Sequence, residues 1–242
     1  MDVQNVDFYG LQALNSGYNY GRTLIQAHGS VGGNRAVFVG LDGIKNELAF
    51  VKFGGRVVNP FKGNAKMFAG DLCEYRTDGT VYFLKTYLVQ DAVAADATVV
   101  YIVRDGYKHI PFVGDILMKA PSTLTGTGTA ATVTAVEQTT NEGANVWKLT
   151  LSAAVGAMSA NDVMIEGVAA GTTTAVVTNP NTMLPMDCDF NYNPAASNDD
   201  FEGARYLVTP SLPALAWLDK LSPMPPSVLA LNKSRITGWF SI

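Results

Sequence analysis

The stretch of sequence that decides the fold extends from Pro111 to Gly167. Apolar and small polar residues alternate there in four short runs, Gly114-Asp115-Ile116-Leu117-Met118, Ala131-Thr132-Val133-Thr134-Ala135-Val136, Asn145-Val146-Trp147-Lys148-Leu149-Thr150-Leu151 and Asn161-Asp162-Val163-Met164-Ile165. Successive side chains of a strand point to opposite faces of a sheet, so this two-residue period is typical of half-buried β-strands. Turn residues such as Gly126, Gly128 and Gly143 separate the runs. The pattern predicts a small antiparallel β-barrel or sandwich.

Strand-like patterns also precede this stretch. Thr77-Asp78-Gly79-Thr80 has the Asp-Gly centre of a hairpin turn, and the run from Ala97 to Val103 is so continuously apolar that we expect a central strand. The composition shifts near Ala120 and again near Asn179. We therefore expect a mainly β chain in three parts: an N-terminal arm and β-rich base over residues 1–110, a projecting β-barrel subdomain over 111–178, and a proline-rich C-terminal segment over 179–242 that returns to the base.

A turn residue, an aspartate and then apolar residues recur three times, with the aspartates at Asp71, Asp115 and Asp162. An aspartate in a turn can accept a hydrogen bond from a nearby backbone N–H. We therefore expect each of these carboxylates to fix the beginning of a strand. A catalytic role would need a partner carboxylate, and the sequence around them offers none.

Charge is sparse, and this limits the classes of partner. Asp, Glu, Lys and Arg make up 16% of the chain, below the ~25% usual for soluble proteins, and the net charge is -4. The 17 basic residues form no stripe, which argues against nucleic acid as a partner. No apolar run approaches the ~20 residues of a membrane span, and residues 1–7 lack the features of a secretory signal. We expect a soluble protein that is made inside a cell and has no membrane partner.

Residues that carry chemistry are few and scattered. His28 and His109 do not cluster with Cys or Asp at metal-ligand spacing, and the sequence has no Gly-x-Ser-x-Gly turn or phosphate-binding loop. The acidic cluster from Asn198 to Glu202 lacks the glycine and the closing glutamate of a calcium loop. Cys73 and Cys188 are compatible with a disulfide or with two free thiols. We predict no enzyme activity, no catalytic residue, no cofactor and no metal.

Aromatic residues near both ends of the chain are the candidate contacts with a partner: Tyr18, Tyr20, Trp217, Trp239 and Phe240. Such side chains bury much apolar area and dominate many interfaces. The segment from Leu212 to Leu221 fits a short helix, and the prolines after it favour an extended path. The alternative is that both ends pack on the chain's own core.

The four alternating runs resemble the β-barrel domains of capsid decoration and head-fibre proteins of tailed bacteriophages. The C-terminal sequence Leu221-Ser222-Pro223-Met224-Pro225-Pro226, with the ending Gly238-Trp239-Phe240-Ser241-Ile242, is similar to auxiliary capsid proteins of crAss-like phages. The resemblance implies a structural protein on the capsid surface of the virion, synthesised in the host bacterial cytoplasm. It implies the major capsid protein as a partner and carries over no functional residue; further copies of the chain are a second candidate partner.

Three functions remain open at this point. The leading expectation is a non-enzymatic virion structural protein that decorates or cements the outer face of a phage capsid. The alternative is a head-fibre or tail adhesion protein, in which pairs such as Tyr18 and Tyr20, or Phe112 and Trp147, stack on host surface glycans. The third is a hydrolase on a β-scaffold, whose carboxylates would meet only in the folded chain.

Overall fold

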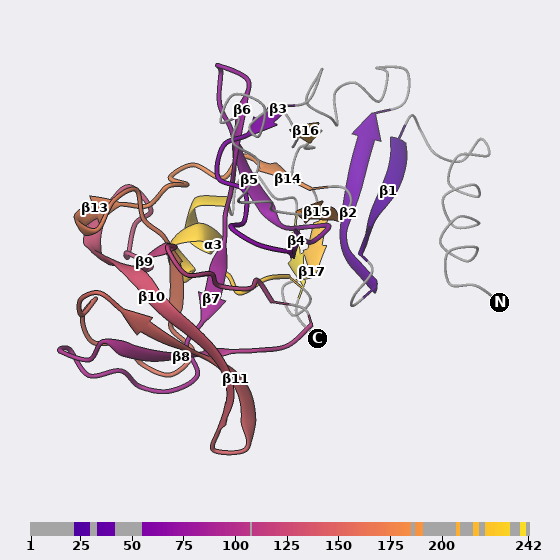
Figure 1. The fold of residues 1–242 in the computed structure, drawn as a ribbon. Coiled ribbons are helices and arrows are strands. Elements are labelled where there is room, and N and C mark those ends of the chain that lie inside the picture. Colours follow the sequence, from indigo (N-terminus) through magenta and orange to yellow (C-terminus); the bar gives the residue numbers. More distant parts are fainter. Residues whose placement is uncertain are drawn as a thin grey trace.

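The structure is a computed structural model that describes residues 22–29, 33–41, 55–106, 108–184, 187–190, 207–208, 215–217, 221–232 and 238–240. Within these ranges the elements are strands, apart from the single helix α3 (Pro226–Asn232). The strands form sheets of seven, five, four and two strands (Figure 1). The chain is mainly β, as the sequence predicts.

The largest sheet contains the stretch that decides the fold. Its order is β7 (Thr86–Leu88), β12 (Val163–Glu166), β9 (Ile116–Lys119), β10 (Thr127–Asn141), β11 (Ala144–Leu151) and β8 (Val99–Val103), and β13 (Gly171–Thr174) also pairs with β10. Its ladders are antiparallel. The four alternating runs coincide with β9, β10, β11 and β12, so the two-residue period identified these strands correctly.

The two ends of this sheet approach each other, but the described strands form no closed barrel. The prediction that β8 is a central strand is wrong, because β8 ends the strand order. Its residues alternate between buried and more exposed positions: Val100 is fully buried, whereas Val99 is 36% exposed. A single bridge between Val89 and Ile102 connects β8 to the chain that follows β7. The class is therefore sandwich-like.

The β10–β11 hairpin extends away from the rest of the sheet (Figure 1). A register shift between Val133 and Ala135 interrupts its ladder, and beyond this bulge the two strands continue to a two-residue turn. Both turn residues have positive φ, 49° at Glu142 and 81° at Gly143. This is the conformation of a type I′ turn, which matches the twist of the strands.

Replacing Glu142 by asparagine should stabilise the protein by about 1 kcal/mol, because asparagine tolerates the left-handed region far better than glutamate. Chemical denaturation followed by circular dichroism measures the change. The control Glu142→Gln removes the charge and keeps the unfavourable backbone conformation. An equal stabilisation by both variants would show that charge, and not conformation, is the cause.

The other sheets join segments that lie far apart in the sequence. The five-stranded sheet has the order β14 (Thr182–Met183), β5 (Leu72–Tyr75), β6 (Thr80–Phe83), β3 (Gly55–Val57) and β16 (Leu207–Val208). The four-stranded sheet has the order β1 (Arg22–Gly29), β2 (Gly33–Leu41), β17 (Leu215–Trp217) and β18 (Gly238–Phe240). The two-stranded sheet pairs β15 (Cys188–Phe190) with β4 (Ala65–Met67).

The predicted helix from Leu212 to Leu221 is wrong, because residues 215–217 form the strand β17. β17 pairs with β2, a strand almost 180 positions earlier in the chain, and this long-range ladder overrides the local helical spacing. The helix of the C-terminal segment begins instead at Pro226, a residue that suits a first helical position because its missing N–H would have no partner there.

The three recurring aspartates act as the sequence predicts. Each accepts a hydrogen bond from the backbone N–H three residues earlier, at 2.7 Å for Asp71, 2.9 Å for Asp115 and 2.8 Å for Asp162. The residue before each aspartate has positive φ: 90° at Gly70, 87° at Gly114 and 68° at Asn161. The same closed turn therefore precedes β5, β9 and β12.

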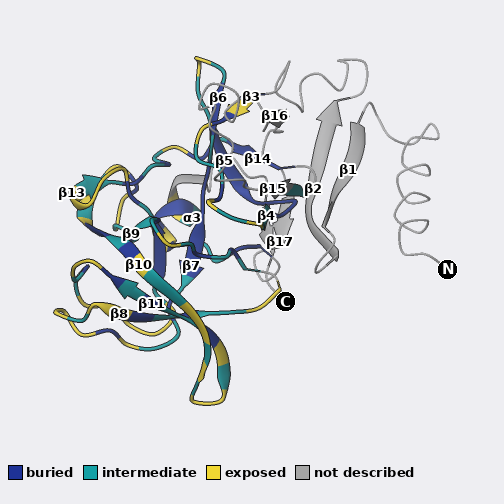
Figure 2. Ribbon diagram, viewed as in Figure 1, coloured by how far each residue is buried: buried dark blue, intermediate teal, exposed yellow. Residues whose placement is uncertain are grey.

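Buried side chains gather in three clusters. One lies within the seven-stranded sheet around Tyr87 and Leu149, and one lies around Phe83 and Phe190. The third connects these regions and includes Val228 of α3. Figure 2 shows the buried residues at the centre of the described fold and the exposed residues at the tip of the β10–β11 hairpin.

Candidate functional site

The predicted contact residues of the C-terminal segment lie in the four-stranded sheet, which joins the two ends of the chain. β17 pairs antiparallel with β2, and β18 pairs parallel with β17, so that Trp239 is opposite Ala216 and Phe240 is opposite Trp217 in the backbone register. The structure thus brings Trp217, Trp239 and Phe240 onto neighbouring strands. Tyr18 and Tyr20 lie outside the described residues.

A buried polar cluster combines Asp71, His109 and Ser222, each no more than 2% exposed. His109 Nε2 is 3.0 Å from Asp71 Oδ2 and 3.2 Å from Ser222 Oγ. The rings of Phe61, Phe68 and Tyr87 surround the imidazole at centroid distances of 5.7, 6.2 and 6.4 Å. The three residue types are those of a nucleophilic triad, so the hydrogen bonds decide whether the cluster can act as one.

The geometry is that of a structural clamp. In a nucleophilic triad the carboxylate and the hydroxyl bind different ring nitrogens of the histidine, and the nitrogen facing the hydroxyl accepts its proton. Here both groups lie against Nε2, while Nδ1 accepts the backbone N–H of Thr86 at 3.0 Å. The hydrogen bonds therefore assign the proton to Nε2, and no ring lone pair is directed at Ser222. The cluster connects β5, β7 and the C-terminal segment.

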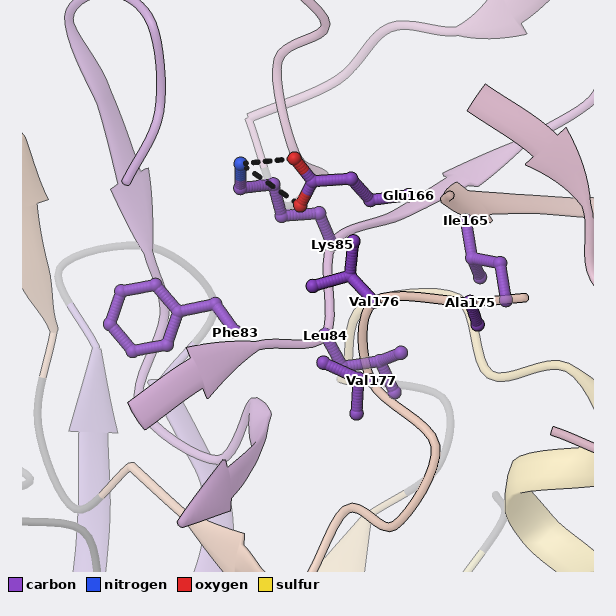
Figure 3. A pocket seen from close by; sticks show the side chains of 8 residues that line it. All are labelled: Phe83, Leu84, Lys85, Ile165, Glu166, Ala175, Val176 and Val177. Carbon is purple, nitrogen blue, oxygen red and sulfur yellow. Dashed lines mark hydrogen bonds and ion pairs between the residues drawn. The ribbon is translucent and has the colours of Figure 1, made fainter. Parts of the chain in front are cut away.

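A shallow hollow lies between the seven-stranded and five-stranded sheets (Figure 3). It encloses about 150 Å³, including open solvent at its mouth, and its lining residues are Phe83, Leu84, Lys85, Ile165, Glu166, Ala175, Val176 and Val177. Its interior has no room for a water molecule. The Lys85 side chain is 1% exposed and its Nζ lies 3.2 Å from Glu166 Oε2, so this hollow is a place where two charged groups meet rather than a ligand pocket.

Asp115 and Tyr87 lie close to this ion pair. Burial raises the pKa of Asp115, and the positive charge of Lys85 and the hydrogen bond from Phe112 N–H only partly oppose that effect. Burial also raises the pKa of Tyr87 well above its usual value, with further contributions from Asp115 and Glu166. The ionised form of Asp115 is therefore less favourable in the folded chain than in the unfolded chain.

The raised pKa of Asp115 predicts that the stability of the fold depends on pH. A carboxyl whose pKa is higher in the folded than in the unfolded chain has no such effect below its unfolded pKa of about 3.9. It destabilises the fold increasingly as pH rises from the unfolded pKa through the folded pKa. The variant Asp115→Asn cannot ionise, so its stability relative to the wild type should improve from acidic to neutral pH. Urea denaturation at several pH values measures this difference.

Asp78 provides the control with the opposite sign. Hydrogen bonds from the Thr80 hydroxyl (2.6 Å) and the Thr80 N–H (3.0 Å) lower the pKa of Asp78, which is exposed. A carboxyl of this kind stabilises the fold above its unfolded pKa, so Asp78→Asn should lose stability relative to the wild type as pH rises. If both variants changed in the same direction, burial would not explain the behaviour of Asp115.

The remaining candidates for chemistry are few in the part of the chain that the structure describes. No group of three or more His, Cys, Asp or Glu side chains there could hold a metal ion, and no helix there is long and apolar enough to cross a membrane. Cys73 and Cys188 are not joined by a disulfide, and burial raises the pKa of Cys73 well above its usual value. The acidic cluster at 198–202 lies outside the described residues.

The aromatic pair Phe112 and Trp147 is not brought together. Phe112 packs against the cluster around Phe83, with its ring 6.2 Å from that of Phe61. Trp147 lies in β11 against the cluster of the seven-stranded sheet, and the Arg104 guanidinium is 5.6 Å from its ring centroid. These two rings therefore do not form a common stacking platform.

Comparison of the chain with protein-family models, with curated proteins and with solved structures gives no match in any of the three.

Lys85, Glu166 and the partners of His109 are not apparent from the sequence as a site. The one local signal is Lys85 itself, a lone charge in the otherwise uncharged run from Val81 to Leu88. A charge in such a run is rarely buried without a partner. Its partner, Glu166, is 81 positions away and could not be identified from spacing.

Proposed function

We propose that the chain is a non-enzymatic structural protein of a phage virion that decorates or cements the outer face of the capsid. The observation that carries the proposal is the four-stranded sheet, in which β2 from the N-terminal region pairs with β17 from the C-terminal region, while β1 and β18 are the outer strands. It provides a base to which both ends of the chain contribute. The β10–β11 hairpin belongs to a different sheet and extends away from the body (Figure 1).

The outer strand β18 supports a docking role for this base. Among the described strands it pairs only with β17, so its other edge has backbone groups that can extend a sheet into a partner. Its sequence Gly238-Trp239-Phe240 supplies aromatic anchors. The major capsid protein is the proposed partner, and neighbouring copies of the chain are the second.

The seven-stranded region suits a surface in contact with other proteins. From residue 120 to 180 only Glu137, Glu142, Lys148, Asp162 and Glu166 are charged. Apolar burial and backbone contacts, which salt does not screen, would then dominate its association.

A quantitative mass-spectrometric inventory of purified virions tests the function. We expect the chain in fixed stoichiometry with the major capsid protein, because decoration follows the symmetry of the shell. Its absence from particles would refute the proposal. A few copies at a single vertex, together with binding to host glycans, would favour the adhesion alternative.

Deleting residues 237–242 should leave a folded protein that no longer binds empty shells, because the deletion removes β18 and its aromatic residues. Circular dichroism reports the fold, and cosedimentation with shells reports binding. The control deletion of residues 241–242 leaves β18 intact and should bind normally. If the longer deletion still binds shells, β18 is not the docking element; if it unfolds, β18 seals the chain's own core.

A further inference from the structure

Side chains from both large sheets meet beside the hollow: Figure 3 shows Lys85 and Glu166, and Asn59 donates a hydrogen bond to Glu166. Asn59 follows β3, Lys85 lies in the connection between β6 and β7, and Glu166 is the last residue of β12. β3 and β6 belong to the five-stranded sheet, whereas β7 and β12 belong to the seven-stranded sheet. The fold therefore assembles an amine, a carboxamide and a carboxylate at the junction of the two sheets.

The carboxylate of Glu166 connects the other two groups. Lys85 Nζ lies 3.2 Å from Oε2 and 3.3 Å from Oε1. Asn59 Nδ2 donates a hydrogen bond to the same Oε2 at 2.8 Å. Glu166 Oε2 thus contacts both the amine of Lys85 and the amide nitrogen of Asn59. A carboxylate in this position can carry a proton from one nitrogen to the other.

The carboxamide of Asn59 is held and polarised by the backbone of Phe83. Its Oδ1 accepts the Phe83 N–H at 2.7 Å, and its Nδ2 also donates to Phe83 O at 2.9 Å. A fixed N–H directed at a carbonyl oxygen stabilises the negative charge that develops there when a nucleophile adds to the carbon. The amide is therefore oriented as well as activated.

The amine is shielded from water. The Lys85 side chain is 1% exposed, its Nζ donates to Pro60 O at 3.0 Å, and it lies 5.1 Å from the centroid of the Phe61 ring. Pro60 follows Asn59 directly, so this hydrogen bond holds the amine close to the chain that carries the amide. The Glu166 carboxylate beside it is placed to accept a proton from the ammonium, and a lysine that has lost this proton is a nucleophile.

We propose that Lys85 and Asn59 form an intramolecular amide cross-link with Glu166 as the proton carrier. The Lys85 ammonium gives a proton to Glu166, and the amine attacks Cγ of Asn59. The new Nζ–Cγ bond forms, the Cγ–Nδ2 bond breaks, and Nδ2 leaves as ammonia with the proton returned by Glu166. The second Nζ proton passes through Glu166 to the ammonia, which departs as ammonium. No oxidant or reductant takes part.

The cross-link would strengthen the junction of the two sheets and is independent of the proposed function. It closes a covalent loop between the segment after β3 and the connection that leads from β6 into β7. A permanent closure of this kind stabilises a fold mainly by restricting the unfolded chain.

The test is mass spectrometry of the purified full-length chain. We expect a mass about 17 Da below that of the sequence, the mass of ammonia. After trypsin digestion, cleavage after Lys85 should be absent. The peptide from Val57 to Lys62 should be joined to the peptide from Thr77 to Arg104, since the nearest other cleavage sites are Arg56, Lys62, Arg76 and Arg104.

Two variants separate this reaction from other losses of ammonia. Lys85→Arg keeps the positive charge but has no reactive amine, and Glu166→Gln removes the proton carrier; both should show the full mass expected for their sequences. A full-mass wild type with normal cleavage after Lys85 would overturn the proposal. So would a loss that persists in Lys85→Arg, because it would indicate cyclisation of an asparagine on its own backbone. If Glu166→Gln showed the same decrease in mass as the wild type, Glu166 would not be the proton carrier.

Discussion

Replacing Phe83 by alanine should lower the free energy of unfolding by about 3–5 kcal/mol, among the largest effects expected of a single substitution in this chain. The Phe83 side chain is fully buried, and its ring meets that of Phe190 edge to face at a centroid distance of 5.4 Å. The substitution removes this contact and leaves a cavity among Val57, Val81 and Phe190. Urea denaturation followed by circular dichroism measures the loss.

The half-buried Phe112 is the matched control for this change. It packs against the same cluster but is only partly buried, so Phe112→Ala removes less buried area than Phe83→Ala. We expect a clearly smaller loss of stability. Equal losses at the two positions would show that burial in this cluster does not determine the effect of Phe83.

Replacing Asp71 by alanine should cost about 2–5 kcal/mol, because it removes the carboxylate that accepts hydrogen bonds from two buried donors. The carboxylate accepts the backbone N–H of Phe68 at 2.7 Å and the Nε2–H of His109 at 3.0 Å. The carboxylate thus joins the turn before β5 to the buried imidazole. The change in unfolding free energy is again measured with urea.

The equivalent turn before β12 offers a control with the same local hydrogen bond. Asp162 accepts the N–H of Ser159 at 2.8 Å, but its side chain is 30% exposed and its other partner is the half-exposed Lys119. Water can replace these contacts, so Asp162→Ala should cost only about 1 kcal/mol. If Asp162→Ala cost as much as Asp71→Ala, the turn itself, and not the buried histidine, would account for the loss.

Much of the β architecture is determined by the sequence alone. The two-residue period at 114–118, 131–136, 145–151 and 161–165 depends only on the alternation of neighbouring side chains, and each run forms a strand. The Asp78-Gly79 turn and the three aspartate turns are also local, because each hydrogen bond joins residues two or three positions apart. The mainly β class and the strand-initiating role of Asp71, Asp115 and Asp162 follow from such short-range chemistry.

Only the tertiary structure decided which distant segments meet. An apolar run can form a central strand or an outer strand, and its sequence does not distinguish the two. The position of β8 is therefore set by its ladder with β11. Likewise, β17 is a strand because β2 pairs with it. The buried clusters are the extreme case: Ser222 reaches His109 across 113 positions and Glu166 reaches Asn59 across 107. No local pattern encodes these contacts, because each group acquires its partner only when the sheets pack and exclude water.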